Sequence, residues 1–186
     1  MLPLQIHLTL PPWIGEVADE RTVCASDEQR VALAVELSRQ NVARGGGGPF
    51  GAAVFEADSG RLVAVGVNRV VPQGCSVAHA EMMALMIAQQ RLGRHRLNAD
   101  GGHYVLASSA QPCCQCYGAT IWAGIDRLLI GARAEDVEAL TEFDEGPLPA
   151  DWLGELERRG IAVRRDLLRD SARSVLADYG ASGTPY

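Results

Sequence analysis

The chain of 186 residues has a mass of 19.9 kDa, the size of one domain, and its 47% hydrophobic residues are enough to bury a core. The net charge of −6 argues against a broad nucleic-acid-binding surface, and the absence of Lys excludes a Schiff-base or P-loop lysine. No apolar run approaches the ~20 residues of a membrane helix, so we expect neither a nucleic acid nor a membrane as partner.

Residues 1–25 are irregular and rich in proline, and we expect them to form an N-terminal arm that packs on one domain of residues 26–186. The N-terminus has no basic region followed by an apolar stretch, so it does not resemble a secretory signal. Without such a signal we expect a cytoplasmic protein, in which clustered cysteines usually serve metal binding or catalysis.

A first helix is predicted to begin after Ser26, because this residue is a good N-cap and Gln29 follows three positions later. The helix should end before the four glycines at 45–48. This glycine run precedes a strand instead of a helix and has no Lys beside it. We therefore interpret it as a flexible turn that leads to Phe50, and not as a phosphate-binding loop.

The rest of the chain alternates between strands and helices. A hairpin is predicted first, with strands at 52–56 and 62–71 joined by a turn at 58–60. The helices that follow are predicted at 78–91, 113–123, 134–140, 152–159 and 170–179, and the strands at 104–107, 127–132 and 161–163. A hairpin followed by this alternation predicts an α/β fold, in which a mixed five-stranded sheet lies between helix layers.

The segment 112–116, Pro-Cys-Cys-Gln-Cys, is one of two fragments that can carry chemistry. Cys113 and Cys116 are three residues apart on a predicted helix, so their sulfur atoms share a face. The N-terminal end of a helix stabilises thiolates, which are the form that a metal ion binds. A Cys-x-x-Cys pair alone is equally compatible with a redox pair, half of a zinc ribbon or two core thiols, although no second pair completes a ribbon.

The segment His79-Ala80-Glu81 is the other fragment, and it also falls at the start of a predicted helix. Taken alone, His79 is more readily a structural histidine, and Glu81 a solvated carboxylate. Two helix starts separated by one strand can, however, converge on a single Zn²⁺. The ligands would then be His79, Cys113 and Cys116, and the fourth position would stay open for water, as in catalytic zinc sites.

The two fragments together match the signature of zinc-dependent base deaminases, which is His-x-Glu followed by Pro-Cys-x-x-Cys. The stretch 48–51, Gly-Pro-Phe-Gly, and Asn68-Arg69 also match. From about residue 27 onward, the chain resembles the cytidine deaminase superfamily. One departure is Gln111, which stands where the family often has a Glu before Pro-Cys.

Within this superfamily, the chain is most similar to the bacterial guanine deaminase branch, especially to members that also accept ammeline. This similarity rests on Ile121-Trp122-Ala123, on Phe143-Asp144-Glu145 and on a chain that ends close to a Tyr. The resemblance implies a three-layer α/β/α sandwich with one Zn²⁺ per chain. It also implies a hydrolase that converts guanine to xanthine and ammonia, with ammeline as a further substrate.

The resemblance further implies the roles of individual side chains. Glu81 would be the proton shuttle between water and the ring, and Glu145 a second carboxylate that holds the substrate and moves protons toward the leaving amine. A homodimer is implied, with a C-terminal segment that completes the partner's pocket. The implied substrate contacts, which on the residues alone could equally be core, strand-end or terminal positions, are Phe50, Asn68, the Ala80 backbone, Trp122, Phe143 and Tyr186.

Three alternatives remain open at this level. The first is a deaminase of another base, such as cytosine, a triazine or adenosine in tRNA, although the negative net charge speaks against tRNA. The second is a non-catalytic binding module stabilised by zinc, in which Glu81 would have no purpose. The third is a redox protein, which would form a disulfide between Cys113 and Cys116 and bind no metal.

Overall fold

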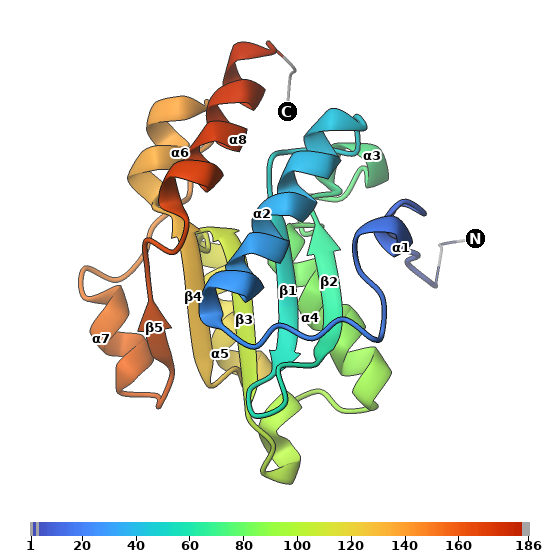
Figure 1. Cartoon of the computed structure of the whole chain (residues 1–186), viewed down its shortest axis with the longest axis vertical. Helices are drawn as coiled ribbons and strands as arrows, with labels where there is room; N and C mark the ends of the chain where they lie inside the picture. The colour runs from blue at the N-terminus through green and yellow to red at the C-terminus, as the bar shows by residue number, and fades with distance from the viewer. Residues whose placement is uncertain (1, 3, 184–186) are drawn as a thin grey trace.

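Five strands form one mixed sheet in the order β2-β1-β3-β4-β5 (Figure 1). The structure is a computed structural model that describes residue 2 and residues 4–183. β1 pairs antiparallel with both β2 and β3, whereas β3, β4 and β5 run parallel. The strands are β1 Gly51–Glu56, β2 Leu62–Val67, β3 Tyr104–Ala110, β4 Arg127–Ala132 and β5 Ala162–Arg164.

Helices cover both faces of the sheet, which confirms the predicted three-layer sandwich (Figure 1). On one face, α2 (Asp27–Ala43) packs on β1 and β3, and α8 (Arg169–Ala181) packs on β4 and beside α6 (Ala134–Leu140). On the other face lie α4 (Ala80–Leu92) and α5 (Cys114–Ala123). The shorter elements are α1 Ile14–Val17, α3 Val70–Gln73, the 3-10 helix Leu97–Asp100 and α7 Trp152–Glu157.

The start of α2 follows the predicted capping pattern. The Gln29 backbone N–H donates to Ser26 Oγ, and Gln29 Oε1 accepts from the Ser26 backbone N–H, both at 3.2 Å. These two bonds satisfy backbone N–H groups that have no partner inside the helix. The capping pair therefore sets where the helix begins, as the sequence indicates.

The strand predicted at 62–71 is wrong beyond Val67. Asn68 turns the chain, because its Oδ1 accepts the Val70 backbone N–H at 3.2 Å and its carbonyl accepts Asn41 Nδ2 at 3.0 Å. The short helix α3 follows where a strand was expected. Valine-rich composition favours a strand, but a side chain that bonds to the nearby backbone offers the chain an alternative.

Two glycines allow helices to lie unusually close to the sheet. A Cβ at Gly66 of β2 would overlap the carbonyl oxygen of Ala80, in the first turn of α4. A Cβ at Gly51 of β1 would overlap the carbonyl oxygen of Ala34 in α2. The position of α4, and with it the residues at its start, therefore depends on a glycine in the neighbouring strand.

The N-terminal arm packs on the rest of the chain. Trp13 is buried in the main core, the guanidinium of Arg44 lies over its ring, and the Cys24 backbone N–H donates to the Gly60 carbonyl at 2.9 Å. The division of the chain between residues 25 and 26 remains a prediction. Within residues 2 and 4–183, no helix is both long and apolar enough to cross a membrane.

Candidate active site

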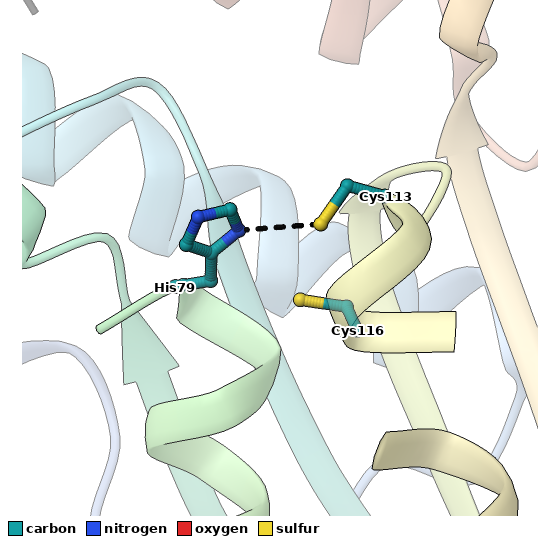
Figure 2. Close-up of side chains that lie close together, drawn as sticks. All are labelled: His79, Cys113 and Cys116. Atoms are coloured by element: carbon teal, nitrogen blue, oxygen red, sulfur yellow. Dashed lines mark hydrogen bonds between the residues drawn. The ribbon is translucent and has the colours of Figure 1, made fainter. Parts of the chain in front are cut away.

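The N-termini of α4 and α5 converge on one point on their face of the sheet (Figure 2). His79 is the N-cap residue of α4 and Cys113 is the N-cap residue of α5, and both have an extended backbone. The side chain of an N-cap residue projects past the helix end, so the imidazole and the thiol face each other. Cys116, one turn into α5, lies fully buried beneath them.

The three side chains fit a zinc ion. His79 Nδ1 and Cys113 Sγ lie 3.4 Å apart, and the three ligand atoms lie within 4.8 Å of one another. Ligands of tetrahedral zinc, at about 2.0–2.3 Å from the ion, lie about 3.3–3.8 Å from one another. One nitrogen and two sulfur atoms form a donor set typical of zinc, and three ligands leave the fourth position open.

The ionisation of the two cysteines also suits the binding of a cation. A hydrogen bond from the Cys116 thiol, together with the facing His79, lowers the pKa of Cys113 to about 4. The same hydrogen bond, together with burial, raises the pKa of Cys116. The pKa of His79 is raised by its contact with Cys113. One thiolate is thus already present, and binding of a metal ion would displace the proton that remains on Cys116.

Glu81 reaches the same point from the first turn of α4, although it is only two residues from His79. It is 6% exposed, its Oε1 accepts from Ser108 Oγ at 3.0 Å, and its Oε2 accepts from Cys116 Sγ at 3.4 Å. Burial, followed by the charge of Cys113, raises the pKa of this carboxyl group. Because His79 has cap geometry and not helical geometry, the two side chains can share one site.

A cavity of about 870 Å³ opens beside the ligand cluster. Its wall includes three aromatic rings in a row, with Phe143 centred 5.3 Å from Phe50 and 5.7 Å from Tyr179. Ala80 and Gln111 also line it. The volume lies within the range of small-molecule sites, and the rings offer flat apolar surfaces.

Glu145 enters this cavity from the loop that follows α6. Its side chain is 9% exposed, whereas the neighbouring Asp144 is exposed and its Oδ1 accepts the Gly146 backbone N–H at 2.8 Å. Burial, followed by the negative charge of Cys113, raises the pKa of Glu145 to about 8. Two buried carboxyl groups, Glu81 and Glu145, therefore line one cavity, and both respond to charge at the ligand cluster.

Asn68 also lines the cavity and is almost fully buried. A network of backbone contacts orients it, because Asn41 Nδ2 donates to the carbonyl oxygens of Gly48 and Asn68 at 2.9 and 3.0 Å. A Cβ at Gly46 or Gly47 would overlap these two asparagines. The glycine run does lead to Phe50, but close packing around Asn41 and Asn68, and not flexibility, explains its composition.

Two predicted contacts have a different outcome. Trp122 is 78% exposed on α5 and does not line the cavity formed by the described part of its own chain, so its contact with the substrate stays a prediction. Tyr186 lies outside the described residues.

Sequence reasoning missed three residues of the site. Gln111, which in the sequence is only a departure from the family pattern, lines the cavity, Ser108 bonds to Glu81, and Tyr179 of α8 completes the aromatic row. For Ser108 and Gln111, the signal was their nearness to Pro112 at the end of β3. Tyr179 gave no signal, because nothing local relates the final helix to the zinc motifs.

Comparison with known proteins adds to this geometry. Residues 24–132 match the family model of the cytidine and deoxycytidylate deaminase zinc-binding region. The guanine deaminase of Bacillus subtilis is 35% identical over 112 residues, which cover 60% of this chain and 67% of that protein. A tRNA-specific adenosine deaminase of Buchnera aphidicola is 28% identical over 131 residues, which cover 70% of this chain and 79% of that protein.

Solved structures give a closer likeness. A structure of guanine deaminase from Nitrosomonas europaea is 49% identical with a TM-score of 0.91, and the match covers 97% of this chain and 99% of that one. A structure of NE0047 with 2,6-diaminopurine is 50% identical with a TM-score of 0.91, covering 97% of this chain and 95% of that one. NE0047 mutants of an asparagine or a glutamate have been solved with 8-azaguanine.

The match to a zinc-binding family and the geometry of His79, Cys113 and Cys116 together confirm the predicted cofactor. They also confirm that the chain is a deaminase acting on a C–N bond. The chain belongs to the cytidine and deoxycytidylate deaminase zinc-binding family.

Proposed function

We propose that the chain catalyses the hydrolytic deamination of guanine, in which water replaces the C2 amine and xanthine and ammonia are released. Ammeline, which also presents an amine on a flat nitrogen heterocycle, is the proposed second substrate. One observation carries the choice of guanine: the buried Glu145 lies in the same cavity as Glu81 and the ligand cluster. The similarity to guanine deaminases from two bacteria supports the same choice.

His79, Cys113 and Cys116 would hold the zinc ion, which supplies a Lewis acid that lowers the pKa of water at its open position. The carboxyl group of Glu81 contacts the ligand Cys116 and is held in place by Ser108 and Cys116. We assign to Glu81 the transfer of the water proton to a ring nitrogen. A raised pKa suits this role, because a group that both accepts and donates a proton works best near the operating pH.

Guanine presents N–H and amine donors along one edge, and an ionised carboxylate is an acceptor that matches two neighbouring donors. We assign this contact to Glu145. Burial raises the pKa of Glu145, so the carboxyl group can also take up a proton and pass it to the leaving amine. Cytosine lacks this pair of donors, so Glu145 should favour guanine-like and aminotriazine rings.

The remaining contacts bind the faces and edges of the base. Phe50 and Phe143 supply apolar ring surfaces, and Asn68 and the Ala80 backbone supply polar edges to the cavity. These groups hold the amine-bearing carbon against Glu81 and exclude water from the rest of the base. Binding energy spent on this orientation lowers the activation barrier, because the reacting groups are already held in the correct geometry.

An ammonia-release assay on the zinc-loaded protein tests the proposed substrate. Guanine, ammeline, cytosine, adenine, cytidine and a tRNA carrying the adenosine substrate should be compared at equal concentration. We expect the highest kcat/KM for guanine and the lowest for tRNA, because the chain carries a net charge of −6. A higher kcat/KM for cytosine or tRNA would contradict the proposal.

We also propose a homodimer in which the C-terminal segment, with Tyr186, completes the partner's cavity. Trp122, Val77 and Met86 are 78%, 43% and 36% exposed, and exposed apolar side chains of this size favour burial against a partner. Five free cysteines suit the reducing cytoplasm, which is the proposed location. The molar mass in solution tests the dimer, because a value near 19.9 kDa would contradict it.

Replacement of Cys113 with Ala should remove zinc and destabilise the protein at the same time, because the metal ion ties the starts of two helices together. Metal content per chain, measured by mass spectrometry of the purified protein, checks this. Cys75→Ala is the matched control and should keep one zinc per chain. Full zinc content in Cys113→Ala would exclude Cys113 as a ligand.

Replacement of Glu81 with Gln should leave zinc content and substrate affinity close to wild type and lower kcat by about 10²- to 10⁴-fold. Gln has the shape of Glu but cannot carry the proton between water and the ring. Steady-state kinetics with guanine, and binding of the analogue 8-azaguanine, separate the two quantities. A variant that turns over at the wild-type rate would remove Glu81 from the mechanism.

Replacement of Glu145 with Ala should lower guanine turnover by about 10²-fold or more with zinc content unchanged, since a positioned proton donor is lost. Asp144→Ala is the matched neighbour and should lose less, because Asp144 is exposed and its carboxylate accepts the Gly146 backbone N–H. Both are measured as kcat for guanine. If Asp144→Ala loses more turnover than Glu145→Ala, the assignment of the second carboxyl group is wrong.

A further inference from the structure

One backbone hydrogen bond joins the Glu145 loop to the helix that carries two of the metal ligands. The backbone N–H of Cys114 donates to the carbonyl oxygen of Glu145 at 3.0 Å. Cys114 is the first residue of α5, and N–H groups in the first turn of a helix have no partner within the helix. The loop thus supplies the missing acceptor at a position between Cys113 and Cys116.

The next residue, Gly146, leaves no room for a side chain. Its φ of +68° is a conformation that favours glycine, and its N–H donates to Asp144 Oδ1 at 2.8 Å. A Cβ at position 146 would lie 2.6 Å from Cys114 Sγ and 3.4 Å from Cys114 Cβ. The loop therefore rests directly on the Cys114 side chain, and its closeness to α5 depends on glycine at this position.

We propose that Gly146 and Cys114 are positioning residues for the reaction, and that their contact holds the Glu145 carboxyl group at its working distance from the ligand cluster. We call this contact, together with the bond from the Cys114 N–H to the Glu145 carbonyl, the Cys114–Gly146 clasp. The inference rests on the proposed function, because it assigns the clasp to the catalytic role of Glu145.

The clasp holds the loop on the C-terminal side of Glu145, whereas on the other side Phe143 holds it through ring contacts with Phe50 and Tyr179. Along the loop the burial alternates, with Glu145 inside and both Asp144 and Pro147 exposed. A loop displaced from Cys114 would carry the carboxyl group with it, and a misplacement of about 1 Å can cost about 10²-fold in rate. The ligands should stay in place, since α4 and α5 hold them, with His79 and Cys113 as the N-cap residues and Cys116 inside α5.

A double-mutant cycle in the zinc-loaded protein isolates the clasp. Gly146→Ala should lower kcat for guanine at least tenfold, with KM and zinc content changed less than twofold. In a Cys114→Ala background, where the Sγ atom is gone and the nearest contact is 3.4 Å, the same change should cost less than threefold. Equal costs in the two backgrounds would overturn the proposal.

A control variant separates two effects of Gly146→Ala, the steric clash with Cys114 and the strain of a side chain at positive φ. Gly93 at the end of α4 has a φ of +65°, and a Cβ added there would meet nothing within 4 Å, so Gly93→Ala should keep the wild-type kcat. In a Glu145→Ala background, Gly146→Ala should change kcat less than twofold, because the clasp acts through Glu145. A further loss of tenfold there would overturn the proposal.

The exchange rate of the Cys114 backbone N–H measures, without substrate, whether the clasp is formed. In Gly146→Ala the Cys114 N–H should exchange at least tenfold faster than in wild type, and unchanged exchange would overturn the proposal. Should Gly146→Ala fail to fold, Asp144→Ala removes only the acceptor of the Gly146 N–H and should also raise the exchange rate. If wild type fails to deaminate guanine, the proposed function fails, but this exchange still tests the clasp.

Discussion

The site depends on the convergence of two helix N-termini. The N-cap residues, His79 and Cys113, have an extended backbone, which directs each side chain beyond its helix instead of along it. The N–H groups of the first turns give this region a positive potential, which favours a thiolate and carboxylates that burial alone would disfavour. A nitrogen, two sulfur atoms and two carboxyl groups can therefore gather at one end of the cavity.

The central strands position the residues that meet at the two helix N-termini. Successive residues of a strand point to opposite faces, and β3 uses this alternation with two neighbouring serines near its end. Ser108 donates to Glu81 on the α4 side, while Ser109 Oγ accepts the Gly51 backbone N–H in β1. Gly66 lets α4 pack closely on β2, so β2 sets how near Glu81 lies to the sheet. Ser108 of β3 provides the hydrogen bond that orients the Glu81 carboxyl group.

The sequence was informative where a local rule governs a position. The capping pair Ser26 and Gln29 and the two zinc fragments depend on short spacings, and the structure contains each of them. It was uninformative where a residue acts through distant packing, since Tyr179 meets Phe143 only because α8 lies beside α6. The contact of Trp122 with the substrate is implied by the family resemblance alone and stays a prediction, since about two helical turns separate this residue from the start of α5.

The two buried carboxyl groups link metal binding to proton transfer. Burial and the negative charge of Cys113 raise the pKa of both Glu81 and Glu145, so each tends to hold a proton while that charge is not balanced. A cation bound by the cluster cancels the charge, lowers both pKa values and releases protons. The metal-free site is therefore an unfavourable assembly of acidic groups that the ion stabilises. Burying these acidic groups lowers the stability of the metal-free fold, and it places two carboxyl groups where they can exchange protons with a bound base.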